Sequence, residues 1–317
     1  MLILGIDIGG TKTAVCMGNE TGEILAAGRM STNPRDGMDT YMSRVRKLVD
    51  EVSAECSIGL GDVDRIGISA PGPLLVEQGV LLAPPNNPGW EQVPIVRLFH
   101  ESFHLPIFLN NDANANALAE YRFGAYKGAN SLIYTTCSTG MGAGIVVNGS
   151  LIQGETDMGG EFGHHCVDPN GPPCDCGRRG CLELYVGGYA LANRLKAMIR
   201  EQHIETTVIE KAGGNIDAIN LEALAAAARE GDAFAVEQWD LLTEYVAVGI
   251  GNLIMIINPR VVIMGTIAIQ QGDFYVGPVR EKLPRYTWSW NREACDVVAS
   301  GLGDQIGNLG ALAVAMQ

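Results

Sequence analysis

The densest group of metal-binding residue types lies in the segment EFGHHCVDPNGPPCDCGRRGCLE, residues 161–183. Its candidate ligands are His164, Cys174, Cys176 and Cys181. One imidazole and three thiolates form a tetrahedral zinc site of the structural kind, with no position left for water. Glycines and prolines between the ligands allow the chain to fold back on a metal ion. Because the C-x-C step is tighter than zinc-finger spacing, we expect a local zinc loop.

Other assignments of this segment stay open. His165 and Cys166 lie beside His164 and could replace it as ligands. The cysteines could also form disulfides or remain free thiols, although nothing in the sequence indicates the secretion that disulfides require. The other cysteines are scattered among apolar residues and are expected to be reduced core thiols. These are Cys16, Cys56, Cys137 and Cys295.

Two carboxylates, Glu161 and Glu183, flank the zinc loop. The ring hydroxyls of a sugar need hydrogen-bond acceptors at fixed positions. A loop held by a metal ion could keep both side chains rigid. The segment therefore suggests sugar binding as well as metal binding.

Two glycine-rich segments have the composition of phosphate-binding turns. The first, DIGGTKT at residues 7–13, contains glycines that let backbone N–H groups approach a phosphate, with a hydroxyl from Thr11 and a positive charge from Lys12. The carboxylate of Asp7 beside phosphates indicates Mg²⁺, bound through water. The second is STGMGAG at residues 138–144. A plain hairpin turn would explain one such segment, but two favour a nucleotide clamp; neither is a Walker A loop.

Three polar residues, Asn110, Asn111 and Asp112, come between an expected strand and an expected helix. Ligands of α/β proteins gather at such strand ends. Asp112 could orient an attacking hydroxyl as a general base. It could equally be the N-cap of the helix that follows. Trp90 could stack on a sugar, but an aromatic after Pro-Gly is more typical of loop packing.

The chain has two similar starts, each a strand, a glycine and threonine turn and a second strand, about 130 residues apart. This predicts a duplicated α/β fold whose two domains face each other across a cleft. We place the domains at residues 1–117 and 118–302, with a helix over 303–317 that packs back on the first. The expected strands cover residues 2–8, 11–18, 23–30, 65–70, 106–109, 131–137, 145–152, 260–264 and 296–299. The expected helices cover residues 37–56, 95–103, 113–123, 182–202, 221–230, 233–257 and 305–316.

Composition limits the classes of function. The 317 residues carry a net charge of −14, which argues against a nucleic-acid surface. A 47% hydrophobic content is enough for a sizeable core. The longest apolar run, residues 245–257, contains Asn252 and is shorter than the roughly 18 residues of a membrane span. With no basic segment before the first apolar run, we expect a soluble cytoplasmic protein without a membrane partner.

Together these motifs resemble the ROK family of repressors and sugar kinases, in the actin-like ATPase superfamily. The resemblance extends from end to end of the chain. It rests on DIGGTK at 7–12, NNDAN at 110–114, STGMGAG at 138–144 and the zinc loop. It implies an α/β fold of two actin-like, ribonuclease H-like domains that close on sugar and ATP, with the zinc loop in the second. It further implies Mg²⁺, a structural Zn²⁺ and a homodimer or dimer of dimers.

The resemblance also implies an activity and roles for individual residues. We expect an ATP-dependent hexose kinase that phosphorylates the 6-hydroxyl of its sugar, glucose first, with Asp112 as general base. His164 would share its two ring nitrogens between zinc and sugar. The sugar-binding residues would be Gly72, Asn86, Asn111, Asp112, Glu161, His164 and Glu183. The nucleotide-binding residues would be Asp7, Gly9, Gly10, Thr11, Lys12, Thr139, Gly140 and Gly265.

Two residues depart from the family pattern. Thr266 follows Gly265 where a second glycine is usual, and Ser138 stands where glycine is common. The main alternative is an N-acetylmannosamine or N-acetylglucosamine kinase, which would differ only in a pocket for the acetamido group. A sugar-responsive repressor and a non-catalytic sugar-binding protein are less favoured. Polyphosphate is a less favoured phosphoryl donor than ATP.

Overall fold

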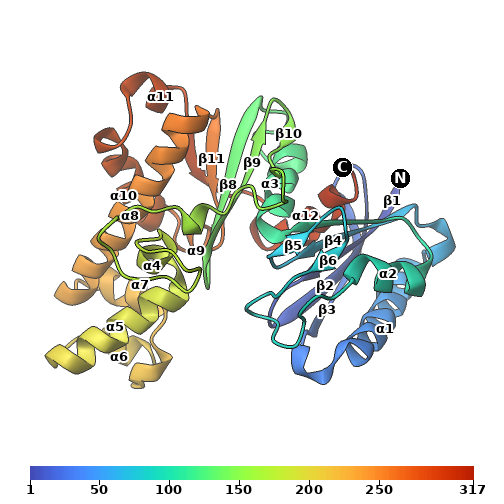
Figure 1. Cartoon of the computed structure of the whole chain (residues 1–317), viewed down its shortest axis with the longest axis horizontal. Coiled ribbons are helices and arrows are strands. Elements are labelled where there is room, and N and C mark those ends of the chain that lie inside the picture. Colours follow the sequence, from blue (N-terminus) through green and yellow to red (C-terminus); the bar gives the residue numbers. More distant parts are fainter. The chain divides into compact units, whose positions relative to one another are not determined.

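Two five-stranded sheets form the framework of the structure, a computed structural model that describes residues 1–317 (Figure 1). Numbered along the chain within each sheet, the strands lie in the order third, second, first, fourth and fifth. The first sheet contains β3 (Ile24–Ser31), β2 (Lys12–Asn19), β1 (Leu2–Ile8), β4 (Arg65–Ala70) and β7 (Ile107–Asn111). The second contains β10 (Ser150–Leu151), β9 (Met141–Val147), β8 (Ser131–Cys137), β11 (Val261–Met264) and β12 (Asp296–Ala299). The repeated order confirms the predicted duplication.

The pairing within the sheets follows the local sequence. Strands β1, β2 and β3 are antiparallel neighbours joined by short turns, as predicted. Strands β4 and β7 join the first sheet in parallel, and β11 pairs in parallel with both β8 and β12. A separate two-stranded ribbon consists of β5 (Leu74–Leu75) and β6 (Val80–Leu81). Parallel strands end at the same edge of a sheet, which is where ligand sites of α/β proteins form.

Helices cover both faces of the first sheet. Alternate residues of a strand point to opposite faces. Leu4, Ile6 and Ile8 of β1 therefore join the core beneath helix α1 (Met38–Cys56), whereas Ile3 joins the core beneath α12 (Ile306–Val314). Helix α12 also packs against α3 (Asp112–Phe123) (Figure 1). A segment from the end of the chain therefore helps to cover the second face of the first sheet.

The remaining helices are mostly in the second half of the chain. They are α2 (Ile95–Phe103), α4 (Glu183–Val186), α5 (Gly188–Gln202), α6 (Val208–Lys211), α7 (Leu221–Arg229), α8 (Ala233–Ile257), α9 (Ile267–Gln271), α10 (Asp273–Lys282) and α11 (Ser289–Glu293). Six single-turn 3-10 helices are η1 (Pro34–Asp36), η2 (Leu60–Asp62), η3 (Phe162–His164), η4 (Ile216–Ala218), η5 (Leu283–Arg285) and η6 (Gly303–Gln305).

Contacts divide the chain into two compact units. The first comprises Met1–Ala129, Gly144–Gly160 and Gly301–Gln317, and the second comprises Asn130–Ala143 and Glu161–Ser300. The C-terminal segment, which carries α12, belongs to the first unit. The predicted division into domains 1–117 and 118–302 stays a prediction. The predicted cleft between these domains also stays a prediction.

Several predicted elements differ from the observed ones. The helix expected over residues 182–202 is broken at Gly187, whose extended backbone (φ −65°, ψ 132°) separates α4 from α5. Helices α6, α9, α10 and α11 were not predicted. In α10, Gly277 and Pro278 are residues typical of turns, which hides the helix in the sequence pattern.

Helix α8 is long and apolar enough to cross a membrane by length and composition. Its apolar stretch is thus longer than the run 245–257 seen in the sequence. Half of that stretch is buried against other parts of the protein. The helix is weak evidence for a membrane span, because helices in the core of a globular protein pass the same test.

Candidate active site

The first glycine segment forms a tight turn over residues 9–11, between β1 and β2. The amide of Gly9 donates to the carbonyl of Lys12 at 2.8 Å, and the amide of Thr32 donates to the carbonyl of Thr11 at 2.9 Å. Thr11 and Lys12 are exposed, so their hydroxyl and ammonium groups are available to a ligand. This first turn has the groups that a phosphate needs: glycine amides, a hydroxyl and a positive charge.

Asp7 lies beside this turn with a fixed carboxylate. Its Oδ1 accepts a hydrogen bond from the Ser69 hydroxyl at 2.8 Å. Enclosure by protein atoms raises the pKa of Asp7, and the Ser69 bond and the charge of Arg29 oppose that rise. A cation nearby would favour the charged form. The residues fit Mg²⁺, which proteins commonly hold through one or two carboxylates, waters and substrate phosphates.

The loop of residues 84–90 packs against the first turn. A side chain at Gly10 would meet the Cβ of Asn86 at 2.6 Å, so only glycine allows this approach. Asn86 itself is exposed, and a side chain at Gly72 would meet no atom within 4 Å. Trp90 is only 1% exposed, and its ring meets Tyr41 edge-on with centroids 4.7 Å apart. The favoured prediction of loop packing for Trp90 is confirmed, and sugar stacking by this ring is excluded by its burial.

The three polar residues where β7 ends and α3 begins have three different roles. Asn110 is fully buried and bonds Asn111, Asn114 and Gln317. The N-cap of α3 is Asn111, whose Oδ1 accepts from the amide of Asn114 at 2.8 Å. The alternative in which Asp112 is the N-cap is therefore wrong.

Asp112 instead occupies the first helical position of α3 and is exposed. Its Oδ1 accepts from the amide of Ala113 at 2.8 Å. The positive end of the helix dipole stabilises a negative charge at this position. An exposed, charged carboxylate can accept a proton, so its geometry is compatible with a general base.

In the second unit, the second glycine segment forms a turn over residues 138–140 only. Strand β9 begins at Met141, so the predicted loop over 138–144 is too long. Gly144, which belongs to the first unit, is a packing residue, because a side chain there would meet the carbonyl oxygen of Ala113 at 2.4 Å. Local sequence could not show this, because the neighbour comes from a distant helix.

The N-terminus of α5 holds this second turn. The amides of Gly188 and Tyr189 donate to the carbonyls of Ser138 and Thr139 at 2.8 and 3.0 Å. These amides belong to the first turn of a helix and have no partner within it. Thr139 is exposed and Gly140 half-buried, as a phosphate-binding turn requires.

The predicted zinc ligands come together. Their ligand atoms, from His164, Cys174, Cys176 and Cys181, all lie within 4.8 Å of one another. The Sγ of Cys174 is 3.8 Å from Nδ1 of His164, and the Sγ atoms of Cys176 and Cys181 are 3.6 Å apart. Three sulfurs and one nitrogen at this spacing fit a tetrahedral zinc ion.

The competing ligands are turned away from this cluster. The Nδ1 of His165 is bonded to the carbonyl of Phe162, its Nε2 lies 3.4 Å from Nδ2 of Asn252, and its ring stacks on Phe162. Cys166 is exposed and contributes no ligand atom. Among the alternatives left open by the sequence, the geometry therefore favours His164.

Two carboxylates accompany the cluster. The Nε2 of His164 is 4.0 Å from Oε1 of Glu183, while its Nδ1 faces the cysteines. Glu161 keeps contact with solvent, yet its partial removal from water raises the pKa of its carboxyl group. The negative charge of Glu183 adds to this rise, and His164 opposes it. The Nε2 of His164 therefore faces Glu183 and not the cysteines. The predicted role of His164, with one ring nitrogen for zinc and the other for sugar, requires this orientation.

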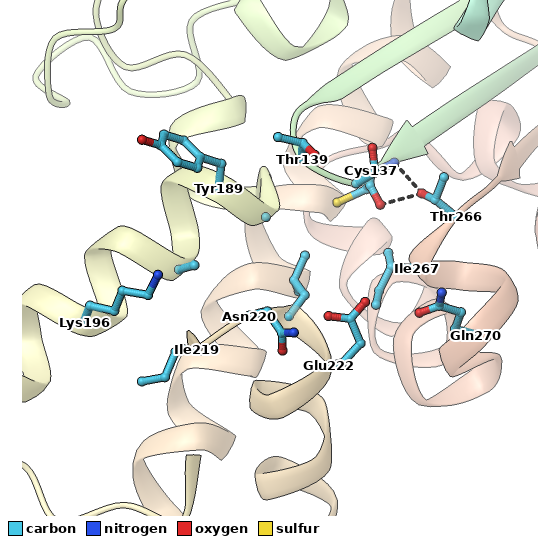
Figure 2. Close-up of a pocket in the computed structure, with 14 residues that line it drawn as sticks. Cys137, Thr139, Tyr189, Lys196, Ile219, Asn220, Glu222, Thr266, Ile267 and Gln270 are labelled. Carbon is cyan, nitrogen blue, oxygen red and sulfur yellow. Dashed lines mark hydrogen bonds between the residues drawn. The ribbon is translucent and has the colours of Figure 1, made fainter. Parts of the chain in front are cut away.

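A cavity of about 420 Å³ lies next to the second turn (Figure 2). Helices α5, α7 and α9 line it, and none of their lining side chains was predicted. Tyr189, Lys196, Asn220, Glu222 and Gln270 are the polar ones. They come from three separate segments of the sequence and form no motif, so no local signal could have identified them.

Gly265 and Thr266 follow β11 at the edge of this cavity. A side chain at Gly265 would overlap the Tyr134 hydroxyl at 1.8 Å, so this residue must be glycine for packing. Thr266 lines the cavity instead. The predicted contact of Gly265 with adenosine stays a prediction.

Comparison with known proteins agrees with these features. The family model described as the ROK family matches residues 3–317. The chain belongs to the ROK family. It is 34% identical to the glucokinase of Thermotoga maritima, over 98% of this chain and 96% of that protein.

Solved structures of ROK proteins share the fold. The ROK family glucokinase of Streptomyces griseus in complex with glucose and AMPPNP is 32% identical, with a TM-score of 0.83 over the whole of both chains. The ROK hexokinase of Thermus thermophilus is 32% identical, with a TM-score of 0.84 over 100% of this chain and 98% of that one. The predicted family and α/β fold are confirmed.

Proposed function

We propose that the protein is an ATP-dependent sugar kinase that transfers the γ-phosphoryl group of ATP to the 6-hydroxyl of a hexose, with glucose as the first candidate. The observation that carries the proposal is the second turn, which opens beside a cavity of about 420 Å³. That volume lies in the range of small-molecule and cofactor sites. The glucokinase relatives, similar over the whole chain, support the same activity.

The nucleotide has a distinct partner in each unit. In the first unit, the amides of the first turn, the Thr11 hydroxyl and Lys12 bind phosphate oxygens, with Asp7 holding Mg²⁺ through water. In the second unit, Thr139 and Gly140 bind phosphate and the cavity takes the nucleoside. Phosphoryl transfer depends mainly on alignment and charge neutralisation, which these groups supply.

The sugar is bound by side chains with fixed orientations. Asp112 accepts the proton of the attacking 6-hydroxyl. The sugar hydroxyls are bound by Gly72, Asn86, Asn111, Glu161, His164 and Glu183. Asn111 is fixed by its capping bond and Glu183 by its bond from the Met141 amide, so each of these two side chains is pre-organised.

Zinc has a structural role in this proposal. Four protein ligands leave no open position, so the ion holds the loop in shape and takes no part in the phosphoryl transfer. His164 then presents Nε2 in a single orientation. We further propose a cytoplasmic location and a homodimer or dimer of dimers, which the family resemblance implies.

The test is ADP release with Mg·ATP across glucose, mannose, fructose, N-acetylglucosamine and N-acetylmannosamine. The proposal expects glucose to have the highest kcat/KM. A preference for either N-acetylhexosamine would replace the substrate and keep the reaction. Activity with polyphosphate and not with ATP would replace the donor. Absence of turnover with every sugar and donor would contradict a kinase, and salt-dependent retention on specific DNA would then favour a repressor.

A further inference from the structure

Thr266 has a backbone conformation that is unusual for a residue with a side chain. Its φ is 47° and its ψ is −104°. Other non-glycine residues with positive φ, such as Ser57 and Asn258, have ψ of 33° and 56° and so lie in the ordinary left-handed region. A β-branched residue at positive φ is a true outlier, and glycine would adopt the conformation without strain. The presence of threonine therefore calls for a compensating interaction.

The compensating interaction is a double hydrogen bond to Cys137, the last residue of β8. The Thr266 hydroxyl accepts from the amide of Cys137 at 2.8 Å and donates to the carbonyl of the same residue (Figure 2). One side chain thus satisfies both backbone groups of Cys137. The regular parallel ladder ends just before, with the amide of Gly265 donating to the carbonyl of Thr135 at 2.8 Å. After β11 has ended at Met264, the Thr266 hydroxyl thus takes the place of a backbone partner for Cys137, the last residue of β8.

Cys137 is the residue from which the second turn starts. The other end of the turn is held by Glu183 through the amide of Met141, and its carbonyls are held by the first amides of α5. Thr266 supplies the anchor at the beginning. Strained backbone held by specific contacts is common at ligand sites, where it fixes groups before binding.

We propose that the Thr266 hydroxyl is a positioning group that fixes the second turn for nucleotide phosphates. Thr266 acts through Cys137 and needs no contact with the reacting atoms. The kinetic part of this inference rests on the proposed kinase function, whereas the structural part does not. Loss of the hydroxyl should weaken nucleotide binding and leave sugar binding unchanged.

The test compares three substitutions. Thr266→Val keeps the branched shape and removes both bonds, Thr266→Ser keeps the hydroxyl, and Thr266→Gly removes the bonds together with the strain. The expected result is a rise of about tenfold in the KM for ATP in the valine and glycine variants, equivalent to ~1.4 kcal/mol, with the KM for sugar unchanged. The serine variant should bind nucleotide like the wild type. Thr287→Val is the matched control, since it removes a hydroxyl bond to the carbonyl of Leu283 elsewhere in the same unit.

Hydrogen exchange of the peptide that covers residues 137–141 gives a readout without catalysis. We expect faster exchange in the valine and glycine variants and wild-type exchange in the serine and control variants. Wild-type exchange and KM in Thr266→Val or Thr266→Gly would overturn the inference. Faster exchange with an unchanged KM for ATP would also overturn the positioning role. A wild-type protein without kinase activity would refute the proposed function, and the exchange comparison would still test the anchor.

Discussion

The Oε2 of Glu183 accepts a hydrogen bond from the backbone amide of Met141 at 2.8 Å. The other oxygen of the same carboxylate lies 4.0 Å from Nε2 of His164. Met141 follows directly on the second turn, and His164 belongs to the metal cluster. One carboxylate therefore joins the metal-binding loop to the turn proposed to bind phosphate. A side chain at Gly140 would meet this carboxylate at 2.4 Å, so the turn and Glu183 pack without space between them.

Replacement of Glu183 should affect both substrates. Glu183→Ala removes a charged acceptor from the Met141 amide, and hydrogen bonds to charged groups contribute about 1.5–3 kcal/mol. The KM for ATP and the KM for sugar should each rise about tenfold to a hundredfold. Glu183→Gln can still accept from Met141, so its KM for ATP should stay near wild type while its KM for sugar rises. If Glu183→Ala raised only the KM for sugar, the Met141 bond would have no functional role.

Asp112→Asn should lower kcat by a factor of about 10² to 10⁴, the usual contribution of a general base. The zinc content should stay unchanged, because Asp112 is no ligand. Asp39→Asn is a matched control, since Asp39 lies in the first turn of α1 as Asp112 does in α3. Both variants lose a helix-dipole interaction of about 0.3–1 kcal/mol, so their melting temperatures should fall by similar small amounts. Near-normal turnover of Asp112→Asn would remove this residue from the mechanism.

Asp7→Asn should stabilise the protein at neutral pH and impair its use of Mg·ATP. Burial raises the pKa of Asp7 above its ordinary range, so the folded state binds this proton more tightly than the unfolded state. The free energy of unfolding therefore falls as pH rises from the unfolded pKa through the folded pKa, and the loss persists at higher pH. The stability gain in Asp7→Asn should be present at neutral pH and disappear as the pH falls below the ordinary pKa of an aspartate. Thermal melting across this range measures it.

The matched variant for Asp7 is Ser69→Ala. The Ser69 hydroxyl bond favours the charged form of Asp7, so its removal should destabilise the protein more at neutral pH than at acid pH. The two variants should thus shift the pH dependence in opposite directions. A lower melting temperature of Asp7→Asn at pH 7 would contradict the assigned cause of the pKa shift.

Removal of zinc should weaken sugar binding. Cys176→Ser should lose the metal, because serine is a poor replacement for a thiolate ligand. Titration with glucose should then show a loss of affinity, since Glu161, His164 and Glu183 depend on the loop. Cys166→Ser is the control, because Cys166 lies in the same loop without a ligand atom in the cluster. Metal-free protein with wild-type sugar affinity would disprove this role of zinc.

Features set by neighbouring residues could be predicted well. Strands β1 to β3, helix α1 and the first turn follow from apolar periodicity and from glycines at the turn. The location of the metal cluster was equally local, because its candidate ligands lie within one loop. The repeated start of the chain likewise predicted two sheets of one topology.

Roles that depend on which atoms face each other could not be predicted in this way. Sequence alone left Asp112 as either general base or N-cap, and only the path of the chain into α3 showed that Asn111 is the cap. The same holds for His164 and His165, whose rings point in different directions from adjacent positions.

The amino-acid sequence by itself thus determined the family, the duplicated α/β fold, the positions of the two turns and the segment that carries the metal cluster, because each depends on short-range spacing or on a motif. Only the tertiary structure decided the composition of the cavity and the role of Thr266. The cavity joins side chains from α5, α7 and α9, and Thr266 bonds a residue 129 positions away. Such contacts form when separate strands and helices pack together, and the spacing of residues along the chain carries no record of them.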